Sequence, residues 1–330
     1  MSPSRTAGGT DGRASRADAR HYAVLRQDFG FCAAAGVVRF VASGVLAMMT
    51  LVPMTGCLFT TRKLPIPTAP LVTQTAAPAE LVKQLNDRWN GLNSLYAKVE
   101  VRASTMKSKV GEEKDYSSFP GIIMMRKPEM LRVYGRFPVI GSPMFNMASD
   151  GKTFTLYVNA KNIAYRGPVE LTHKSTNPIE NMRPGFFLDA LIVRGLAADD
   201  EYMQVADTDT VEDPKRKHLL LVEEYILTVM RGKPGSQEHK PMRVIHFHRD
   251  DLLPYEQDLY DEQGNLETEV TYGQYVDFGG SKYPSTVKIK RPLEEFQVVL
   301  TVESVKENLD LKDDQFQIEI PPDVKIQTLQ

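Results

Sequence analysis

The most constraining feature of this sequence is a two-residue alternation of apolar and polar side chains that recurs between about residues 97 and 306. In 97–103, alanine and valine alternate with lysine, glutamate and arginine, and 296–302 repeats the pattern with larger apolar residues. Successive side chains of a strand point to opposite faces of its sheet. The alternation therefore predicts antiparallel strands with one buried face and one solvated face. About ten such segments predict a sheet wide enough to curl.

Two helices are expected beside this sheet. In 79–92, three leucines and the only tryptophan recur at helical spacing, which predicts an amphipathic helix. Pro184 suits the first turn of a second helix, which carries Phe186, Phe187 and Leu191. The predicted fold class is α+β and mainly antiparallel β. We expect a curled, incomplete barrel whose open side is covered by helices.

An export signal precedes the predicted domain. Residues 40–57 read FVASGVLAMMTLVPMTGC and follow Arg39 directly, so a positive flank leads into a short apolar run. The ending resembles the lipobox of bacterial lipoproteins, in which the cysteine, here Cys57, receives a diacylglyceryl group and becomes the new N-terminus. Met54 stands where the pattern prefers Leu, Val or Ile. The alternative is an uncleaved transmembrane anchor, but the run is short for the roughly 20 residues that span a bilayer and contains Pro53.

These signals divide the chain into three parts. We predict a leader and signal peptide at 1–56, a lipid-anchored, proline-rich tether at 57–78, and one folded domain at 79–330. The leader carries six Arg and three Asp, so the remainder of a chain with net charge −2 carries −5. That balance argues against nucleic acid and against membrane binding by charge alone. Cys32 lies in the leader and Cys57 is the lipidation site, so the domain has no cysteine for a disulfide.

The order of segments resembles the LolA/LolB-like fold of bacterial lipoprotein-handling proteins. The stretches that carry the resemblance are LNSLYAKVEV, FPGIIMMRKPEMLRVYGRFP, the hairpin SDGKTFTLYV and the final FQIEIPPDVKI, within about 79–325. In that family an incomplete barrel covered by helices encloses a hydrophobic cavity for acyl chains. The resemblance implies binding of acyl chains or lipoprotein anchors, on the membrane-anchored acceptor side. Leu58 replaces the Asp that retains many lipoproteins at the inner membrane, so the outer membrane is expected.

Candidate ligand-binding residues lie in two apolar segments. Residues 137–147 contain Pro138, Gly141 and Pro143 and are interpreted as an apolar loop, which either protrudes to contact lipid or folds over the barrel mouth as core. Whether the interior holds an open cavity or a filled core is also left open. The predicted ligand-binding residues are Phe137, Val139, Ile140, Met144 and Phe145 at the mouth, and Phe186, Phe187 and Leu191 on the helical lid.

The strongest metal-like pattern is His246-Phe-His248. On a strand both imidazoles and Asp250 share one face, as two zinc ligands would require. Two ligands do not complete a site, and no third is placed by spacing. We therefore predict no metal, and interpret the histidines as polar spacers on a solvated face.

No catalytic signature accompanies these features. Members of each adjacent acidic pair point to opposite faces of a strand and cannot converge for acid–base chemistry: Glu223/Glu224, Asp250/Asp251 and Glu294/Glu295. Nucleophile-elbow, phosphate-loop, dinucleotide and zinc-protease motifs are absent from the sequence. We expect a binding protein without catalytic residues or cofactors. The alternative is a structural or assembly lipoprotein that docks another envelope protein and takes no lipid ligand.

Overall fold

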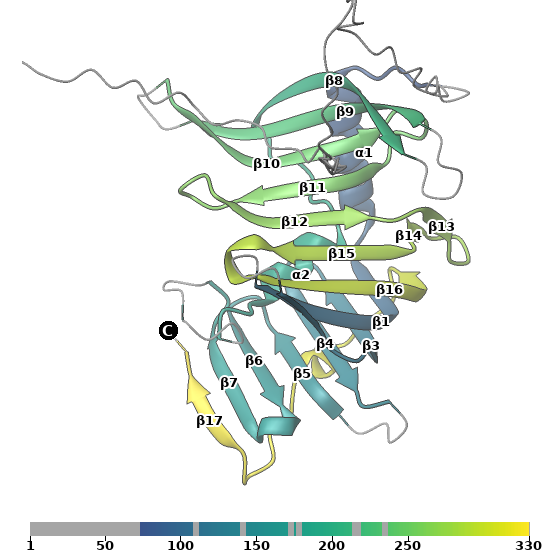
Figure 1. Cartoon of the computed structure of the whole chain (residues 1–330). Helices are drawn as coiled ribbons and strands as arrows, with labels where there is room; N and C mark the ends of the chain where they lie inside the picture. The colour runs from purple at the N-terminus through teal and green to yellow at the C-terminus, as the bar shows by residue number, and fades with distance from the viewer. Residues whose placement is uncertain are drawn as a thin grey trace, which may run out of the picture. The chain divides into compact units, whose positions relative to one another are not determined.

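A computed structural model describes residues 73–107, 112–138, 143–170, 175, 180–212, 219–232 and 237–329. Within these residues one 15-stranded sheet dominates (Figure 1). Its strands are β1 (Ser94–Lys107), β2 (Glu112–Asp115), β3 (Phe119–Arg126), β4 (Met130–Arg136), β5 (Pro143–Ser149), β6 (Thr153–Val158), β7 (Ile163–Pro168), β8 (Glu201–Glu212), β9 (Leu219–Gly232), β10 (His239–His248), β11 (Pro254–Tyr260), β12 (Leu266–Tyr272), β15 (Thr286–Arg291), β16 (Phe296–Glu307) and β17 (Lys325–Thr328). A separate two-stranded sheet pairs β13 (Tyr275–Asp277) with β14 (Lys282–Pro284). The helices are α1 (Pro78–Gly91) and α2 (Pro184–Leu191), with 3₁₀ turns η1 (Asn159–Lys161), η2 (Pro292–Glu294) and η3 (Asp313–Phe316).

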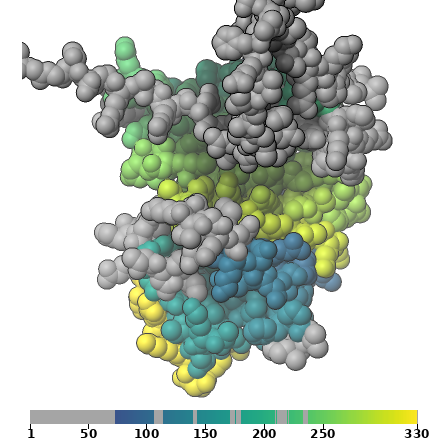
Figure 2. All heavy atoms as spheres, viewed as in Figure 1, coloured from purple at the N-terminus to yellow at the C-terminus, as the bar shows by residue number. Residues whose placement is uncertain are grey.

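The strand order leaves the sheet open. It runs β17-β7-β6-β5-β4-β3-β1-β16-β15-β12-β11-β10-β9-β8, with β2 beside β1. Among the described strands only β17 and β7 pair in parallel. Because β1 lies between β3 and β16, the first strand touches the last long one, visible in Figure 2 as blue beside yellow. The two edges, β17 and β8, do not pair with each other within the described residues, so the expected incomplete antiparallel barrel is confirmed.

Register shifts help to explain why the sheet curls. They interrupt the pairing of β1 with β16 at Lys98/Val99, of β4 with β5 at Gly135/Arg136 and of β10 with β11 at His246/Phe247. Such bulges bend a strand and increase its local twist.

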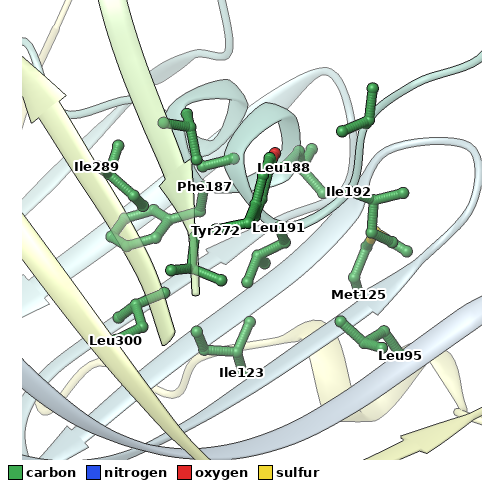
Figure 3. Close-up of a cluster of buried hydrophobic side chains, with 14 of the residues drawn as sticks. Leu95, Ile123, Met125, Phe187, Leu188, Leu191, Ile192, Tyr272, Ile289 and Leu300 are labelled. Atoms are coloured by element: carbon green, nitrogen blue, oxygen red, sulfur yellow. The ribbon is translucent and has the colours of Figure 1, made fainter. Parts of the chain in front are cut away.

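The inner face of the sheet is apolar and is covered by both helices. α1 passes behind β9–β12 in Figure 1 and buries Leu81 and Leu85 in the core. It starts at Pro78, whose missing N–H costs nothing at the first helical position. α2 is buried on most of its surface, as its sequence predicted. Figure 3 shows its side chains, among them Leu188 and Leu191, directed at the inner residues of several strands.

Part of the outer face is buried as well, which the simple alternation did not predict. Met124 of β3 packs against Leu311 and Phe316, which belong to the segment that contains η3. Arg132 of β4 donates from Nη1 to the carbonyl of Gln315 at 2.9 Å. The C-terminal segment therefore covers the outer side of β3 and β4, which explains why Ile122–Met125 is apolar on both faces.

Two local expectations differ from the structure. Residues 143–147 begin strand β5 and are not loop, because a proline is tolerated as the first residue of a strand. Residues 74–77 also pack on the sheet. The backbone N–H of Gln74 donates to the carbonyl of Arg249 at 2.6 Å, and Ala76 is buried. The leader, Cys57 and most of the tether lie outside the described residues. Neither described helix is both long enough and apolar enough to cross a membrane.

Candidate ligand-binding site

Two hollows lie on the inner side of the sheet, next to the segment that runs from the last turn of α2 to Arg194. Leu191, Ile192 and Val193 line the first, and Asp189 and Arg194 line the second. Residues 189–194 therefore lie between the two hollows, and we name this segment the partition.

The first, which we name the apolar hollow, measures about 260 Å³. α1 contributes Leu85 and Gly91 to its wall, and the partition contributes three aliphatic side chains. Charged side chains also line it: Asp87, Arg88, Lys282 and Glu307. The remaining wall residues are Leu92, Pro254, Tyr272, Tyr275, Tyr283 and Pro284.

The three tyrosines of the apolar hollow use their hydroxyl groups inside the protein. Tyr283 donates to the carbonyl of Leu191 at 2.6 Å, and Tyr275 donates to that of Pro254 at 2.9 Å. The Tyr272 hydroxyl accepts from the side-chain amide of Gln257 at 2.8 Å. Burial raises the pKa of all three phenols well above its usual range. The phenols therefore stay neutral, and their engaged hydroxyls leave mainly ring surface for a ligand.

The second, which we name the arginine hollow, measures about 640 Å³ and lies between α2 and the inner face of β9–β12 and β15. Two of its arginines are fully paired. Arg194 Nε contacts Asp189 Oδ1 at 2.5 Å, and Arg291 contacts Glu294 at 2.9 Å and Glu267 at 3.2 Å. Three further arginines line it: Arg183, Arg231 and Arg243.

The predicted ligand-binding residues fall at several places. Leu191 lines the apolar hollow and Phe186 lines the arginine hollow. Phe187 lines neither hollow and is buried in the hydrophobic core (Figure 3). Met144 and Phe145, on β5, pack against the core, and the Phe145 ring meets Phe119 edge-on at 5.7 Å.

The rest of the predicted mouth does not join either hollow within the described residues. Phe137 lines a separate shallow hollow of about 510 Å³ with Tyr96, Ile122 and Tyr134. Val139, Ile140 and Cys57 lie outside the described residues. The wall tyrosines and the arginines gave no sequence signal, because they come from different strands and from the segment around α2 and meet only in the folded protein.

The histidine pair is separated by its partners. His246 Nδ1 is 2.9 Å from Glu224 Oε2, whereas the His248 ring stacks on Tyr255 at 4.1 Å. The acidic residues near His246 are Glu256, directly opposite on β11, and Asp258, and ligand atoms of the three lie within 4.8 Å of one another. This group therefore combines one histidine of the pair with two carboxylates of the neighbouring strand β11, and His248 does not belong to it.

Of the adjacent acidic pairs only Glu223/Glu224 lies on a strand, β9, and its members diverge as expected. The expected strand position is wrong for Asp250/Asp251, which lie in a turn after β10, and for Glu294/Glu295, which lie at η2. Glu224 faces His246, whereas Glu223 accepts from Arg249 Nη1 at 2.5 Å. Glu294 is held by Arg291 through two contacts of 2.9 and 3.0 Å. Each of these carboxylates therefore serves a separate ion pair.

Comparison with known proteins gives similarity of structure only. No family model matches the sequence, and a search of curated proteins finds no match. A LolA superfamily protein from Nitrosomonas europaea has a TM-score of 0.46 at 14% identity, covering 74% of this chain and 99% of that chain. A DUF1329 family protein from Desulfovibrio piger has a TM-score of 0.46 at 15% identity, covering 73% and 95%. An outer-membrane lipoprotein-sorting domain from Vibrio parahaemolyticus has a TM-score of 0.40 at 10% identity, covering 72% and 94%.

Proposed function

We propose that this protein binds the acyl chain of a lipid, or of a lipoprotein's lipid anchor, in the apolar hollow. One observation carries the proposal: aliphatic and aromatic side chains form most of the wall, and the tyrosine hydroxyls within it are already hydrogen-bonded. An apolar ligand can then enter without leaving a buried polar group unpaired, which would be costly. Burial of each methylene contributes about 0.8 kcal/mol, so six contribute about 5 kcal/mol.

The proposed binding role fits an anchored envelope protein. Because residues 74–77 pack on the sheet, a lipid on Cys57 and the tether of residues 58–73 would hold the domain within about 50 Å of a membrane surface, at roughly 3 Å per extended residue. We place the protein at the outer membrane, facing the periplasm, where it would shelter or accept acyl chains during lipoprotein localisation.

The test is uptake of cis-parinaric acid, whose fluorescence rises in an apolar site. The protein is purified as residues 58–330, the predicted mature chain without its cysteine, so that neither the apolar run of residues 40–56 nor an attached lipid competes for the hollow. Gly91 lies on the wall, and no described atom lies within 4 Å of the position that its Cβ would occupy. Gly91→Phe should fill the hollow and weaken uptake about tenfold, a loss of about 1.4 kcal/mol that matches fewer than two buried methylenes.

Gly91→Ala is the matched control, because it makes the same backbone change with little added volume. It should keep the uptake of the parent protein. The proposal of acyl binding in this hollow is wrong if the parent takes up no parinaric acid. It is also wrong if Gly91→Phe binds parinaric acid as tightly as Gly91→Ala does.

A second candidate function, docking of another envelope protein, is favoured by the edge strand β8. Three large apolar side chains are exposed there, Tyr202, Met203 and Val205, and the strand has a neighbour on one side only within the described residues. An unprotected strand edge can pair with a strand of another chain. Met203→Lys should abolish recovery of a cross-linked envelope partner and leave parinaric acid uptake unchanged.

A further inference from the structure

More arginines than acidic residues line the arginine hollow. Five arginines line it, against three acidic residues, Asp189, Asp200 and Glu267. Arg194 pairs with Asp189, and Arg291 pairs with both Glu267 and Glu294. Arg183, Arg231 and Arg243 form no side-chain ion pair with a carboxylate among the described residues.

Arg183 is the strongest indication of a ligand. Only 7% of the residue is exposed, yet its Nε has no hydrogen-bond partner among the described residues. Its Nη1 donates to the backbone carbonyl of Glu180, and its guanidinium lies 4.9 Å from the centre of the Phe154 ring. The Glu180 carboxylate accepts from Ser175 at 2.7 Å and from Gln327 at 3.1 Å. A buried guanidinium is costly unless its charge is offset, and Arg183 lines the hollow, so an anion bound there would offset that charge.

Arg243 adds a second buried positive charge. Its Nη1 and Nη2 donate to the carbonyls of Arg194 and Gly195 at 2.6 and 3.0 Å, so these hydrogen bonds satisfy donors without neutralising the charge. Burial lowers the pKa of this guanidinium, and Asp200 and Asp189 oppose that effect. Arg231 is exposed on the same wall.

The wall of the arginine hollow is also partly apolar. Phe186, Val229, Met242 and Leu259 line it beside the guanidinium groups. A ligand that suits this surface therefore has an anionic group attached to an apolar portion. Arginine presents paired N–H donors that match the oxygens of a carboxylate or phosphate.

We propose that the arginine hollow binds the anionic head group, phosphate or carboxylate, of an acyl-bearing ligand. The inference rests on the proposed function, since it assigns the charged end of the same class of molecule. Arg183 and Arg231 contact the head group. Arg243 holds the backbone at Arg194 and Gly195 through its hydrogen bonds and adds positive charge to the hollow.

The experiment compares two lipids that share one oleoyl chain: lysophosphatidic acid, which is anionic, and monooleoylglycerol, which is neutral. Each displaces parinaric acid from the purified protein of residues 58–330. The anionic lipid should bind about tenfold more tightly, and added salt should reduce the difference. Arg231→Gln and Arg183→Gln should each remove most of this advantage and leave monooleoylglycerol unaffected. Arg231 is exposed, so its variant stays informative if Arg183→Gln fails to fold.

Arg102→Gln is the charge-matched control, because Arg102 is exposed and does not line the hollow. It should behave as the parent. Equal affinity for the two lipids, or an equal loss in Arg102→Gln and Arg231→Gln, overturns the head-group site while acyl binding stands. If neither lipid binds, acyl binding fails, and inorganic phosphate is then tested alone. If phosphate raises the Tm and Arg231→Gln abolishes the rise, the hollow binds a free anion, and the proposal that its ligand carries an acyl chain is overturned.

Discussion

Gly135 of β4 shows how a single residue fixes the packing near the bulge between β4 and β5. A Cβ at this position would lie 2.6 Å from Phe145 Cε1 and 2.8 Å from Phe119 Cε2, because the two rings meet edge-on over the strand. Gly135→Ala should therefore destabilise the protein by about 1–3 kcal/mol, as overpacking of a filled core usually does. Chemical denaturation measures the change. Gly91→Ala, in open space, should not lower stability, and an equal loss in both variants would contradict the steric explanation.

Glu256 gives a pH-dependent prediction on the outer face. Burial raises its pKa, the nearby His246 opposes the shift, and Asp258 and other carboxylates add to it. Burial also raises the pKa of Asp258. In the window between the unfolded and folded pKa values the folded state binds more protons, so stability falls as pH rises through that window. Glu256→Gln cannot ionise and should raise Tm at pH 7, with the gain vanishing below about pH 4, where the unfolded carboxyl is protonated as well.

The control for this effect is Glu303→Gln, an exposed residue of β16. Its Tm should match that of the parent at both pH values. A gain for Glu256→Gln that persists undiminished at low pH would show that packing of the amide, and not removal of charge, stabilises the variant.

At the scale of elements, α2 holds the two sides of the curled sheet together. Leu188 is buried in the hydrophobic core, where it lies near Leu191 and Ile192 in Figure 3. Leu188→Ala should cost about 2–5 kcal/mol, since it removes buried methyl groups and leaves a cavity. Leu293 in η2 is 51% exposed, so Leu293→Ala should change stability by no more than about 0.5 kcal/mol. Urea titration of both variants measures the contrast, and similar losses would mean that α2 rests loosely on the sheet.

Elements with a strong local pattern were predictable, and those defined by distant pairing were not. The alternation in 97–103 and 296–302 identified β1 and β16, because each strand buries one face. β17 was missed because its residues are mostly exposed and its strand exists through parallel pairing with β7. α2 was predicted from its apolar cluster, but the partition that follows it depends on tertiary contacts.

The candidate site was less predictable than the fold for the same reason. Leu191 and Phe186 were identified by hydrophobicity, and each lines a hollow. Arg183, Arg231 and Arg243 look like ordinary surface residues in sequence, because nothing local distinguishes them. They meet only after β9 and β10 pair and α2 closes over them. Polar residues that face a sheet interior leave no periodic signal beyond an interrupted alternation.

At the scale of the whole molecule, the strand order places β1, the first strand of the chain, beside the late strand β16 in the middle of the sheet. β1 follows α1 directly and is paired on both sides, with β3 and with β16. The chain therefore enters the fold at the centre of the sheet, while residues 74–77 pass along β9 and β10 near its far edge. Any force transmitted from an anchored N-terminus would first act on residues 74–77 and α1, and α1 forms one wall of the apolar hollow.

This arrangement makes the nature of the anchor functionally important. If Cys57 carries diacylglyceryl, the leader is removed and only the tether joins the domain to a membrane. Cys57→Ser should then abolish incorporation of radiolabelled palmitate and prevent signal cleavage at this position, which mass spectrometry of the N-terminus detects. The uncleaved variant should remain in the inner-membrane fraction, held by residues 40–56, whereas the parent should sediment with the outer membrane. If the parent N-terminus is instead unprocessed and unlabelled, residues 40–56 are a permanent anchor, and lipid binding in the hollows would have to serve the inner membrane.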